Sequence, residues 1–319
     1  MKDGFGRIID YARISITDRC NLRCTYCMPD GVSEMSHDEI LRFEEVLRLA
    51  RILAGMGITR LKVTGGEPFV RSGAIGFLSE LKRLDGISQV TLTTNGALLE
   101  KYIPELVNIG IDGINISLDT LSSEKFRVLA GTDKLTSVLR SIELCARSGL
   151  RTKVNTVLLG NINKDEVVRI ADFAREKVAA VRFIELMPVG QSLGADIFSV
   201  DELMYILECA LGKLEAIDEK LGNGPATYYR VKGFAGKIGI IPAMSRSFCA
   251  SCNRIRLTSD GFLKLCLSRD EGVDLRSKLR GGAYDFDIAR IIEQAIMNKP
   301  EISGFDKASS GRPMHTIGG

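Results

Sequence analysis

The stretch "GINISLD", residues 113–119, alternates polar and apolar side chains with a period of two. Asn115, Ser117 and Asp119 are therefore expected on one side of an extended strand, and the aliphatic residues between them on the other. Such a strand has one face suited to packing against helices and one face that needs polar partners or a ligand.

Strands of the same kind recur along the first 190 residues and alternate with amphipathic helical segments. This order is typical of a parallel sheet with helical crossover connections, either open or rolled into a barrel. The further strand candidates are residues 12–18, 58–66, 88–96, 151–159 and 178–189.

The polar positions of these strands are expected to share one face. An ordinary eight-stranded barrel fills its interior with branched apolar side chains. We therefore predict an α/β fold with an incomplete (βα)6 TIM-type barrel around a ligand chamber; a sheet with one solvated face is the alternative. In the last strand, Glu185 and Met187 are expected inside, and Ile184 and Leu186 outside. The other expected chamber positions are Arg13, Ser15, Thr17, Lys62, Thr64, Thr91, Thr93, Asn95, Asn115, Ser117, Asp119, Lys153 and Asn155.

The pattern changes beyond residue 190. A helix near residues 200–212 is followed by two antiparallel hairpins, over 226–243 and 254–267, and by helical segments within 273–298. The predicted domains are a partial barrel over residues 1–190 and a C-terminal α+β region over residues 191–319.

Composition excludes some partners. The net charge of +3 is too small to indicate nucleic acid, and no apolar run is long enough to span a bilayer. The opening "MKDGFGRIID" lacks the layout of a secretory signal. We expect a cytoplasmic protein with no membrane or nucleic-acid partner.

Six of the eight cysteines fall into two groups of three, Cys20/Cys24/Cys27 and Cys249/Cys252/Cys266. In a reducing compartment such clustering indicates metal binding rather than disulfides. Cys145 and Cys209 stand apart within helical patterns and are expected to be buried core thiols.

The first group directly follows the first strand, where parallel barrels place their chemistry. Three thiolates can hold an iron–sulfur cluster that normally takes four, which leaves one iron open. Zinc with a distant fourth ligand and incidental thiols are the alternatives, although only His37 and His315 could supply an imidazole to zinc.

The spacing Cys-x-x-x-Cys-x-x-Cys, with Tyr26 before the last cysteine, resembles the signature of radical S-adenosylmethionine (SAM) enzymes. The resemblance implies a 4Fe-4S cluster whose open iron binds SAM and whose electron generates a 5′-deoxyadenosyl radical. "TGGEP", residues 64–68, resembles the family's second motif. By matching positions, the implied SAM contacts are Tyr26, Gly65, Gly66, Glu67, Ser117 and Met187.

The second group again offers three thiols, and a zinc-ribbon half-site is the plain alternative. Arg254 and Arg256 follow Cys252 at strand spacing, so both guanidiniums point the same way. Arginine binds phosphate oxygens bidentately, which favours a polyphosphate beside this centre; two solvent-facing arginines on a hairpin are the other reading.

This block, and almost the whole chain, is similar to the GTP 3′,8-cyclases of molybdenum cofactor biosynthesis, which are lyases. The resemblance implies a second 4Fe-4S cluster on Cys249, Cys252 and Cys266 that binds guanine. It also implies triphosphate contacts from Arg13, Arg254 and Arg256, and further GTP contacts from Lys62, Thr93 and Lys153. Lys62 stands where arginine is expected, which keeps the charge but loses the bidentate fork.

On composition alone, the terminal Gly318-Gly319 is expected to be disordered. The resemblance instead implies a tail that enters the chamber and positions an active-site arginine. It further implies a reductase or flavodoxin-type electron donor, a downstream cyclic pyranopterin monophosphate synthase and a possible homodimer. Two rival functions remain at this point: a peptide-modifying maturase with an auxiliary cluster, and a non-catalytic zinc-binding module.

Overall fold

The computed structural model describes residues 1–28, 35–188, 198–305 and 314–318. Its strands form one twelve-stranded sheet in the order β12-β11-β10-β1-β2-β3-β4-β5-β6-β9-β8-β7. The strands are β1 (Tyr11–Ser15), β2 (Arg60–Thr64), β3 (Gln89–Thr94), β4 (Gly113–Ser117), β5 (Thr152–Leu158), β6 (Ala180–Glu185), β7 (Glu215–Ile217), β8 (Thr227–Arg230), β9 (Lys237–Ile241), β10 (Arg254–Leu257), β11 (Phe262–Lys264) and β12 (Gly272–Asp274).

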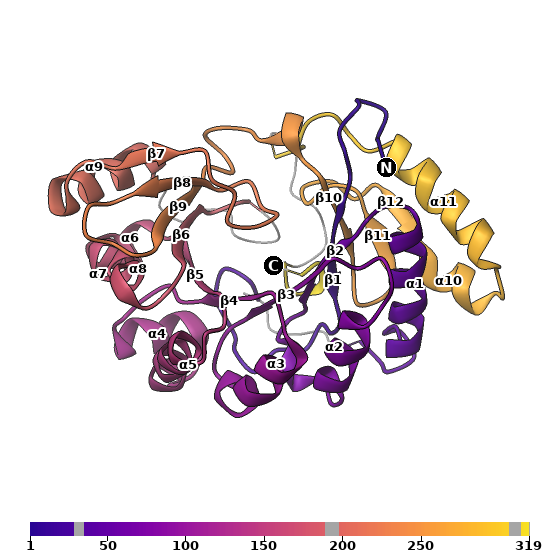
Figure 1. Ribbon diagram of the computed structural model, residues 1–319, viewed down its shortest axis with the longest axis horizontal. Coiled ribbons are helices and arrows are strands. Elements are labelled where there is room, and N and C mark those ends of the chain that lie inside the picture. Colours follow the sequence, from indigo (N-terminus) through magenta and orange to yellow (C-terminus); the bar gives the residue numbers. More distant parts are fainter. Residues whose placement is uncertain (29–34, 189–197, 306–313, 319) are drawn as a thin grey trace.

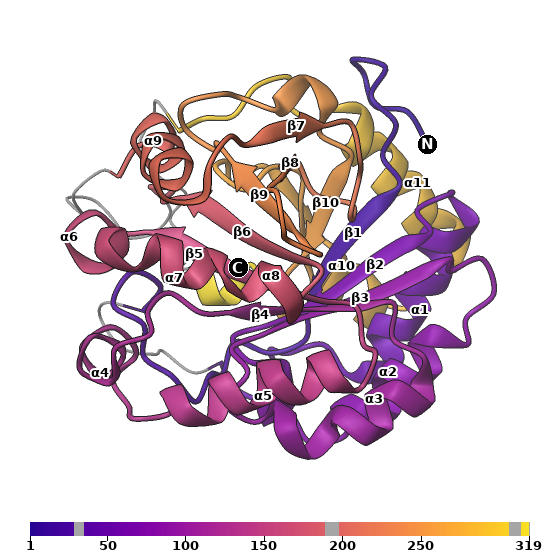
Figure 2. The same ribbon diagram turned by 60° about the vertical axis from the view of Figure 1, so that its left-hand side comes forward.

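Helices connect the parallel strands and cover the outside of the curved sheet (Figures 1 and 2). The α-helices are α1 (Phe43–Gly55), α2 (Ala74–Lys82), α3 (Ile103–Ile109), α4 (Ser123–Ala130), α5 (Leu135–Arg147), α6 (Gly160–Asn163), α7 (Val167–Ala171), α8 (Phe173–Glu176), α9 (Val200–Leu211), α10 (Leu275–Arg280) and α11 (Asp285–Met297). Short 3-10 turns are η1 (Pro68–Val70), η2 (Leu99–Tyr102), η3 (Lys164–Glu166), η4 (Cys249–Ser251) and η5 (Met314–Thr316).

The predicted alternation of strands and helices is confirmed, and the first six strands run parallel. The predicted hairpins are also present, as β8–β9 and β10–β11. In addition, β10 pairs parallel with β1, and β9 pairs parallel with β6. The C-terminal strands therefore extend both edges of the barrel sheet, which the sequence pattern did not indicate.

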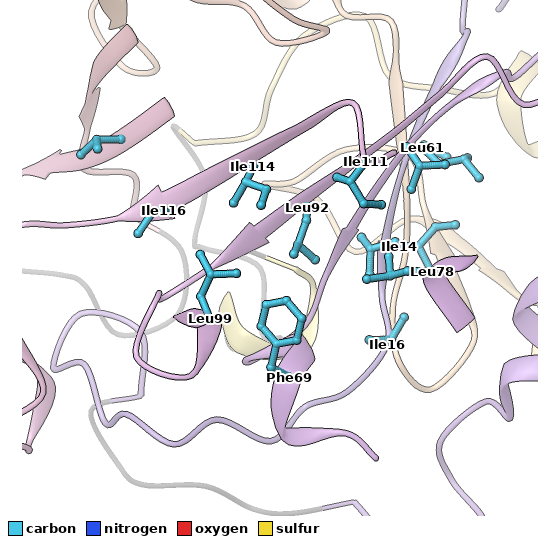
Figure 3. Packing of buried hydrophobic residues seen from close by; sticks show 14 of the residues in the cluster. Ile14, Ile16, Leu61, Phe69, Leu78, Leu92, Leu99, Ile111, Ile114 and Ile116 are labelled. Carbon is cyan, nitrogen blue, oxygen red and sulfur yellow. The ribbon is translucent and has the colours of Figure 1, made fainter. Parts of the chain in front are cut away.

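The hydrophobic core lies between the sheet and its outer helices. Figure 3 shows Ile14, Leu61, Leu92 and Ile114 from neighbouring strands packed together with Leu78 of α2. All of these side chains are almost fully buried. Because the apolar side of each strand is committed to this core, the polar side is left facing the interior of the barrel.

Strand β6 departs from the predicted alternation. Asn155 faces the chamber and lies beside Arg182 in the parallel register, so Arg182 and Ile184 face inward and Phe183 joins the outer core. The expectation that Glu185 lies inside and Ile184 outside was wrong. Each face of the strand carries one charged residue among apolar ones, Arg182 inside and Glu185 outside, so Glu185 was a misleading marker of the inner face. Its carboxylate instead accepts the backbone N–H groups of residues 244 and 245.

One of the two isolated thiols is also placed differently from the prediction. Cys145 is buried on α5, as expected, but Cys209 on α9 is exposed. Helix α9 buries Val200, Leu203 and Leu207, and Cys209 lies about 200° around the helix from Leu207. Among the described residues, no helix is both long enough and apolar enough to cross a membrane.

Candidate active site

One cavity of about 290 Å³ opens inside the curve of the sheet and is lined by both cysteine groups. Residues from the barrel strands and from the C-terminal region thus meet around one space. Lys62, Glu67, Lys153 and Gly318 do not line the cavity, and Gly319 lies outside the described residues. The predicted site residues that line it are Arg13, Cys20, Cys24, Tyr26, Cys27, Gly65, Gly66, Thr93, Ser117, Met187, Cys249, Cys252, Arg254, Arg256 and Cys266.

The first cysteine loop follows β1 and is held by backbone contacts to α4. The N–H groups of Arg23 and Thr25 donate to carbonyls at the end of that helix, over 2.8 and 2.9 Å. Two further donors point at sulfur: the N–H of Leu22 lies 3.4 Å from Cys20 Sγ, and Asn95 Nδ2 lies 3.6 Å from it. N–H groups directed at sulfur are typical of iron–sulfur sites, where they adjust the reduction potential.

Burial raises the pKa of each thiol in this loop, to about 12 for Cys27 and well above the usual value for Cys24. A buried thiolate is unfavourable unless a nearby positive charge compensates it. Iron supplies that charge, so binding a cluster would release the thiol protons.

The second cysteine group comes from η4 and from the end of the β10–β11 hairpin. The N–H of Ser303 donates to Cys249 Sγ at 3.2 Å, and the Ser268 hydroxyl lies 3.4 Å from Cys266 Sγ. Burial acts to raise the pKa of Cys252, but the charges of Lys299 and Arg254 outweigh it and lower that pKa.

Neither group forms a compact single-ion site. Nowhere in the described parts of the chain do three Cys, His, Asp or Glu side chains converge closely enough to hold one metal ion. A zinc site requires such convergence, whereas in a four-iron cluster each thiolate binds a different iron. The described donors therefore do not form a preassembled site for a single zinc ion.

The Gly-Gly turn after β2 packs against the segment that precedes the first cysteine loop. The N–H of Gly66 donates to Thr17 O at 2.7 Å, and a Cβ at Gly66 would lie 2.3 Å from Arg19 O. Close approach therefore requires glycine here. Neither Gly65 nor Gly66 has a positive φ, so it is this close approach, and not a left-handed backbone conformation, that requires glycine.

Glu67 is fully buried beneath this turn rather than directed into the cavity. Its carboxylate accepts hydrogen bonds from the Thr94 hydroxyl and from the N–H groups of Phe69 and Asn95, over 2.7 to 3.2 Å. Burial raises its pKa to about 7, although these hydrogen bonds oppose the shift. Glu67 thus braces the turn that carries the two glycines.

The remaining predicted SAM contacts line the wall between the cysteine loop and β4. The Tyr26 hydroxyl donates to Asp119 Oδ2 at 2.7 Å, and Asp119 Oδ1 accepts the N–H of Val157 at 2.8 Å. Ser117 precedes Asp119 by two residues, Met187 follows β6, and all of these residues line the cavity.

Six basic side chains, here called the basic cluster, lie near one another on the inner face of the sheet. Burial lowers the pKa of Lys62 well below its usual value, and the other positive charges of the cluster lower it further. Neither Lys62 nor Lys153 pairs with a carboxylate within the described ranges. Buried cations of this kind call for an anion. The members are Arg13, Lys62, Lys153, Arg182, Arg254 and Arg256.

Arg182 is the member of the basic cluster that the sequence reasoning missed. Its Nε donates to Asn155 Oδ1 at 2.9 Å, and its Nη2 donates to Asn115 Oδ1. The signal that could have found it is the register of β6, which places Arg182 beside Asn155. That register is not visible in the sequence of β6 alone.

The C-terminal tail enters the barrel, where η5 lies inside the curve of the sheet (Figure 2). Met314 and His315 line the cavity, and Gly318 O accepts a hydrogen bond from Arg256 Nη1 at 2.9 Å. Gly318 has φ +73°, and a Cβ there would lie 2.2 Å from Thr64 Oγ1. The prediction that the tail enters the chamber is met as far as Gly318.

Comparison with known proteins agrees with this site. Residues 14–174 match the model of the radical SAM superfamily, and residues 179–305 match that of the Molybdenum Cofactor Synthesis C family. The chain is 41% identical to a GTP 3′,8-cyclase of Clostridium perfringens (strain 13 / Type A) and 42% identical to one of Thermodesulfovibrio yellowstonii, over the full length of each pair. The chain belongs to the GTP 3′,8-cyclase family. Both rival functions, the peptide-modifying maturase and the zinc-binding module, are therefore set aside.

Solved structures confirm the fold of this cyclase family member. Streptococcus suis SuiB bound to S-adenosylmethionine superposes with a TM-score of 0.63 at 15% identity, over 84% of this chain and 63% of that one. Native anSMEcpe with bound AdoMet gives 0.51 at 22% identity, over 62% of this chain and 58% of that one. The cofactors of the family are SAM and two 4Fe-4S clusters. In this chain, two sets of three thiols line the cavity.

Proposed function

We propose that this chain converts GTP into 3′,8-cyclo-7,8-dihydro-GTP, an early step of molybdenum cofactor biosynthesis. The observation that carries the proposal is that two sets of three thiols and a buried basic cluster surround one cavity. No other part of the described chain combines these features.

At one end of the cavity, Cys20, Cys24 and Cys27 are proposed to hold the first cluster. Reduced and bound to SAM, this centre supplies the 5′-deoxyadenosyl radical that removes hydrogen from ribose C3′. The backbone at Gly65 and Gly66 approaches SAM closely, and Glu67 supports that turn from beneath. Tyr26, Ser117 and Met187 border the same space and orient the cofactor.

The basic cluster is proposed to bind the GTP triphosphate. Arg256 on β10 lies directly beside Arg13 on β1, and Arg254 precedes Arg256 by two residues, so three guanidiniums lie close together on two strands. A triphosphate would relieve the mutual repulsion of these buried cations, and each charge-assisted hydrogen bond adds about 1.5–3 kcal/mol. Lys62, Lys153 and Arg182 extend the site along the inner face, and Thr93 lies on the cavity wall.

At the other end, Cys249, Cys252 and Cys266 are proposed to hold the second cluster against the guanine base. With the triphosphate and the base both fixed, ribose C3′ and guanine C8 are held close enough to bond. Such positioning can account for several kcal/mol of a reaction barrier. The Gly318 contact steadies Arg256 during this step, and Gly319 is proposed to act with it.

The partners of the reaction follow from its chemistry. Reductive SAM cleavage needs one electron, and the cyclised nucleotide radical needs a second electron and a proton to become the dihydro product. We propose that a reductase or a flavodoxin-type protein donates both electrons. The cyclic product would pass to a cyclic pyranopterin monophosphate synthase. All eight cysteines are free, which fits the reducing cytoplasm, and a homodimer is a further expectation.

The test uses anaerobically reconstituted enzyme, a strong reductant, SAM and GTP deuterated at ribose C3′. Mass spectrometry should find deuterium in 5′-deoxyadenosine, together with the cyclised nucleotide. Deoxyadenosine without deuterium would mean a different abstracted atom or substrate. No deoxyadenosine from fully loaded protein would overturn the assignment of the first cysteine loop.

A further inference from the structure

Lys299, just beyond α11, is among the largest fully buried side chains of the protein. It lines the cavity at the second cysteine group rather than at the basic cluster. Its ammonium donates to the carbonyl oxygen of Leu265, next to Cys266 in the chain, and also hydrogen-bonds the Cys252 thiol. Lysine is almost never fully buried unless its charge is paired.

No carboxylate pairs with Lys299 anywhere in the described chain. Lys264, which is equally buried, shows the usual arrangement, because its ammonium forms an ion pair with Asp270 at 2.9 Å. The charged groups that face Lys299 are the Cys252 and Cys266 thiols and the Arg7 guanidinium, and Arg7 is itself a cation. Among the described residues, the negative charge that faces Lys299 is therefore that of these thiols as thiolates, together with what they bind.

A four-iron core of formal charge about +2 with three thiolates carries a net charge of about −1, which becomes about −2 on reduction. We infer that Lys299 is the counter-charge of the second cluster, and that its ammonium raises the reduction potential of that cluster and strengthens its retention. The inference rests on the proposed function in that Cys249, Cys252 and Cys266 must hold a cluster. Lys299 acts through the cluster and is a positioning residue.

The N-terminal arm holds this lysine in place. Arg7 donates to Cys249 O at 2.9 Å, to Pro300 O at 2.7 Å and to Glu301 O at 2.9 Å, so it joins the cysteine turn to the segment that carries Lys299. Asp3 pairs with the same guanidinium at 2.6 Å. The Arg7 charge is thus already neutralised by a carboxylate. The cations left beside these thiols are Lys299 and Arg254, and Arg254 is already assigned to the triphosphate.

The experiment compares Lys299→Met, Lys299→Arg and Lys264→Met. Each is made in the full-length chain with Cys20, Cys24 and Cys27 changed to alanine, so that only the second cluster is observed. Iron and sulfide are counted after anaerobic reconstitution, and the midpoint potential is measured by redox titration followed by EPR. Lys264→Met is the matched control, because it removes a buried ammonium that does not line the cavity.

Lys299→Met should shift the midpoint potential to a more negative value, because reduction then adds an electron without a nearby cation. Loss of the cluster from this variant alone, with unchanged circular dichroism, would equally support the inference. Lys299→Arg and Lys264→Met should keep the cluster and a potential near that of the parent.

An unchanged potential in Lys299→Met, or the same defect in folded Lys299→Arg, would overturn the counter-charge role and leave the cyclase assignment intact. A parent chain that binds no second cluster would overturn both the inference and the proposed function of these cysteines.

Discussion

Arg256 Nη1 donates a hydrogen bond of 2.9 Å to the carbonyl oxygen of Gly318, across 62 residues of sequence. Arg256 belongs to the basic cluster, and Gly318 reaches it only because the tail enters the barrel. Gly318 therefore contacts an arginine of the basic cluster without lining the cavity, whereas Met314 and His315 of the same tail do line it.

Gly318→Ala should reduce cyclisation by about tenfold or more, because a positive φ and a methyl group against Thr64 would both displace the tail. Deleting Gly318 and Gly319 should abolish cyclisation. Iron content should stay unchanged in both variants. Gly149→Ala is the matched control, since Gly149 has φ +79° but open space around it. Normal turnover after the deletion would refute the role of the tail.

Arg254→Ala and Arg256→Ala should each lower kcat/KM for GTP by about 10- to 100-fold, the value of one or two charge-assisted hydrogen bonds. Both should retain iron, because the cysteines are untouched. Steady-state kinetics with parallel iron analysis checks this. Wild-type turnover in either variant would remove that arginine from the phosphate site.

Arg182→Met should weaken GTP binding, since it removes a buried cation of the basic cluster. Arg182→Lys should recover only part of the loss, because an ammonium cannot span Asn115 and Asn155 as the guanidinium does. Equilibrium binding of GTP to the two variants provides the comparison. Equal affinity for GTP in Arg182→Met and wild type would show that Arg182 contributes nothing to phosphate binding.

GTP affinity should fall as pH rises above about 7, and Lys153 should cause part of that fall. Burial, with the charges of Arg182 and Arg151, lowers the pKa of Lys153 to about 7, so the lysine is neutral at higher pH and loses its attraction for phosphate. Each pH unit costs up to about tenfold from this group. Lys153→Arg stays charged and should show a flatter profile between about pH 7 and about pH 9. If the GTP affinities of wild type and Lys153→Arg fell in parallel with rising pH, deprotonation of Lys153 would not be the cause.

Phe183→Ala should lower the free energy of unfolding by about 3–5 kcal/mol, because Phe183 is fully buried in the outer core. Ile184→Ala, on the cavity side of the same strand, should cost clearly less. Urea unfolding of the two variants tests which face of β6 packs against the helices. The reverse order of stabilities would restore the alternation first predicted for this strand.

Local patterns explain why most of the barrel was predictable. Alternation along β4 places Asn115 and Ser117 opposite Ile114 and Ile116 whatever the rest of the chain does. The spacing of Cys20, Cys24 and Cys27 likewise brings three thiols into one loop. The prediction for strand β6 failed because each face carries one charged residue among apolar ones, so that only its pairing with β5 shows which side is inside.

By itself the sequence determined the strand–helix order, the two sets of three thiols and the apolar faces, because each depends on residues close together in the chain. Only the tertiary structure decided that β10 lies beside β1, that both cysteine groups open into one cavity, and that no carboxylate of the described residues pairs with buried Lys299. These depend on contacts between residues far apart in sequence, which no local periodicity records. The sequence did not show how the charges of the basic cluster and of Lys299 are balanced, for the same reason. That balance depends on which groups, distant in sequence, are buried next to one another.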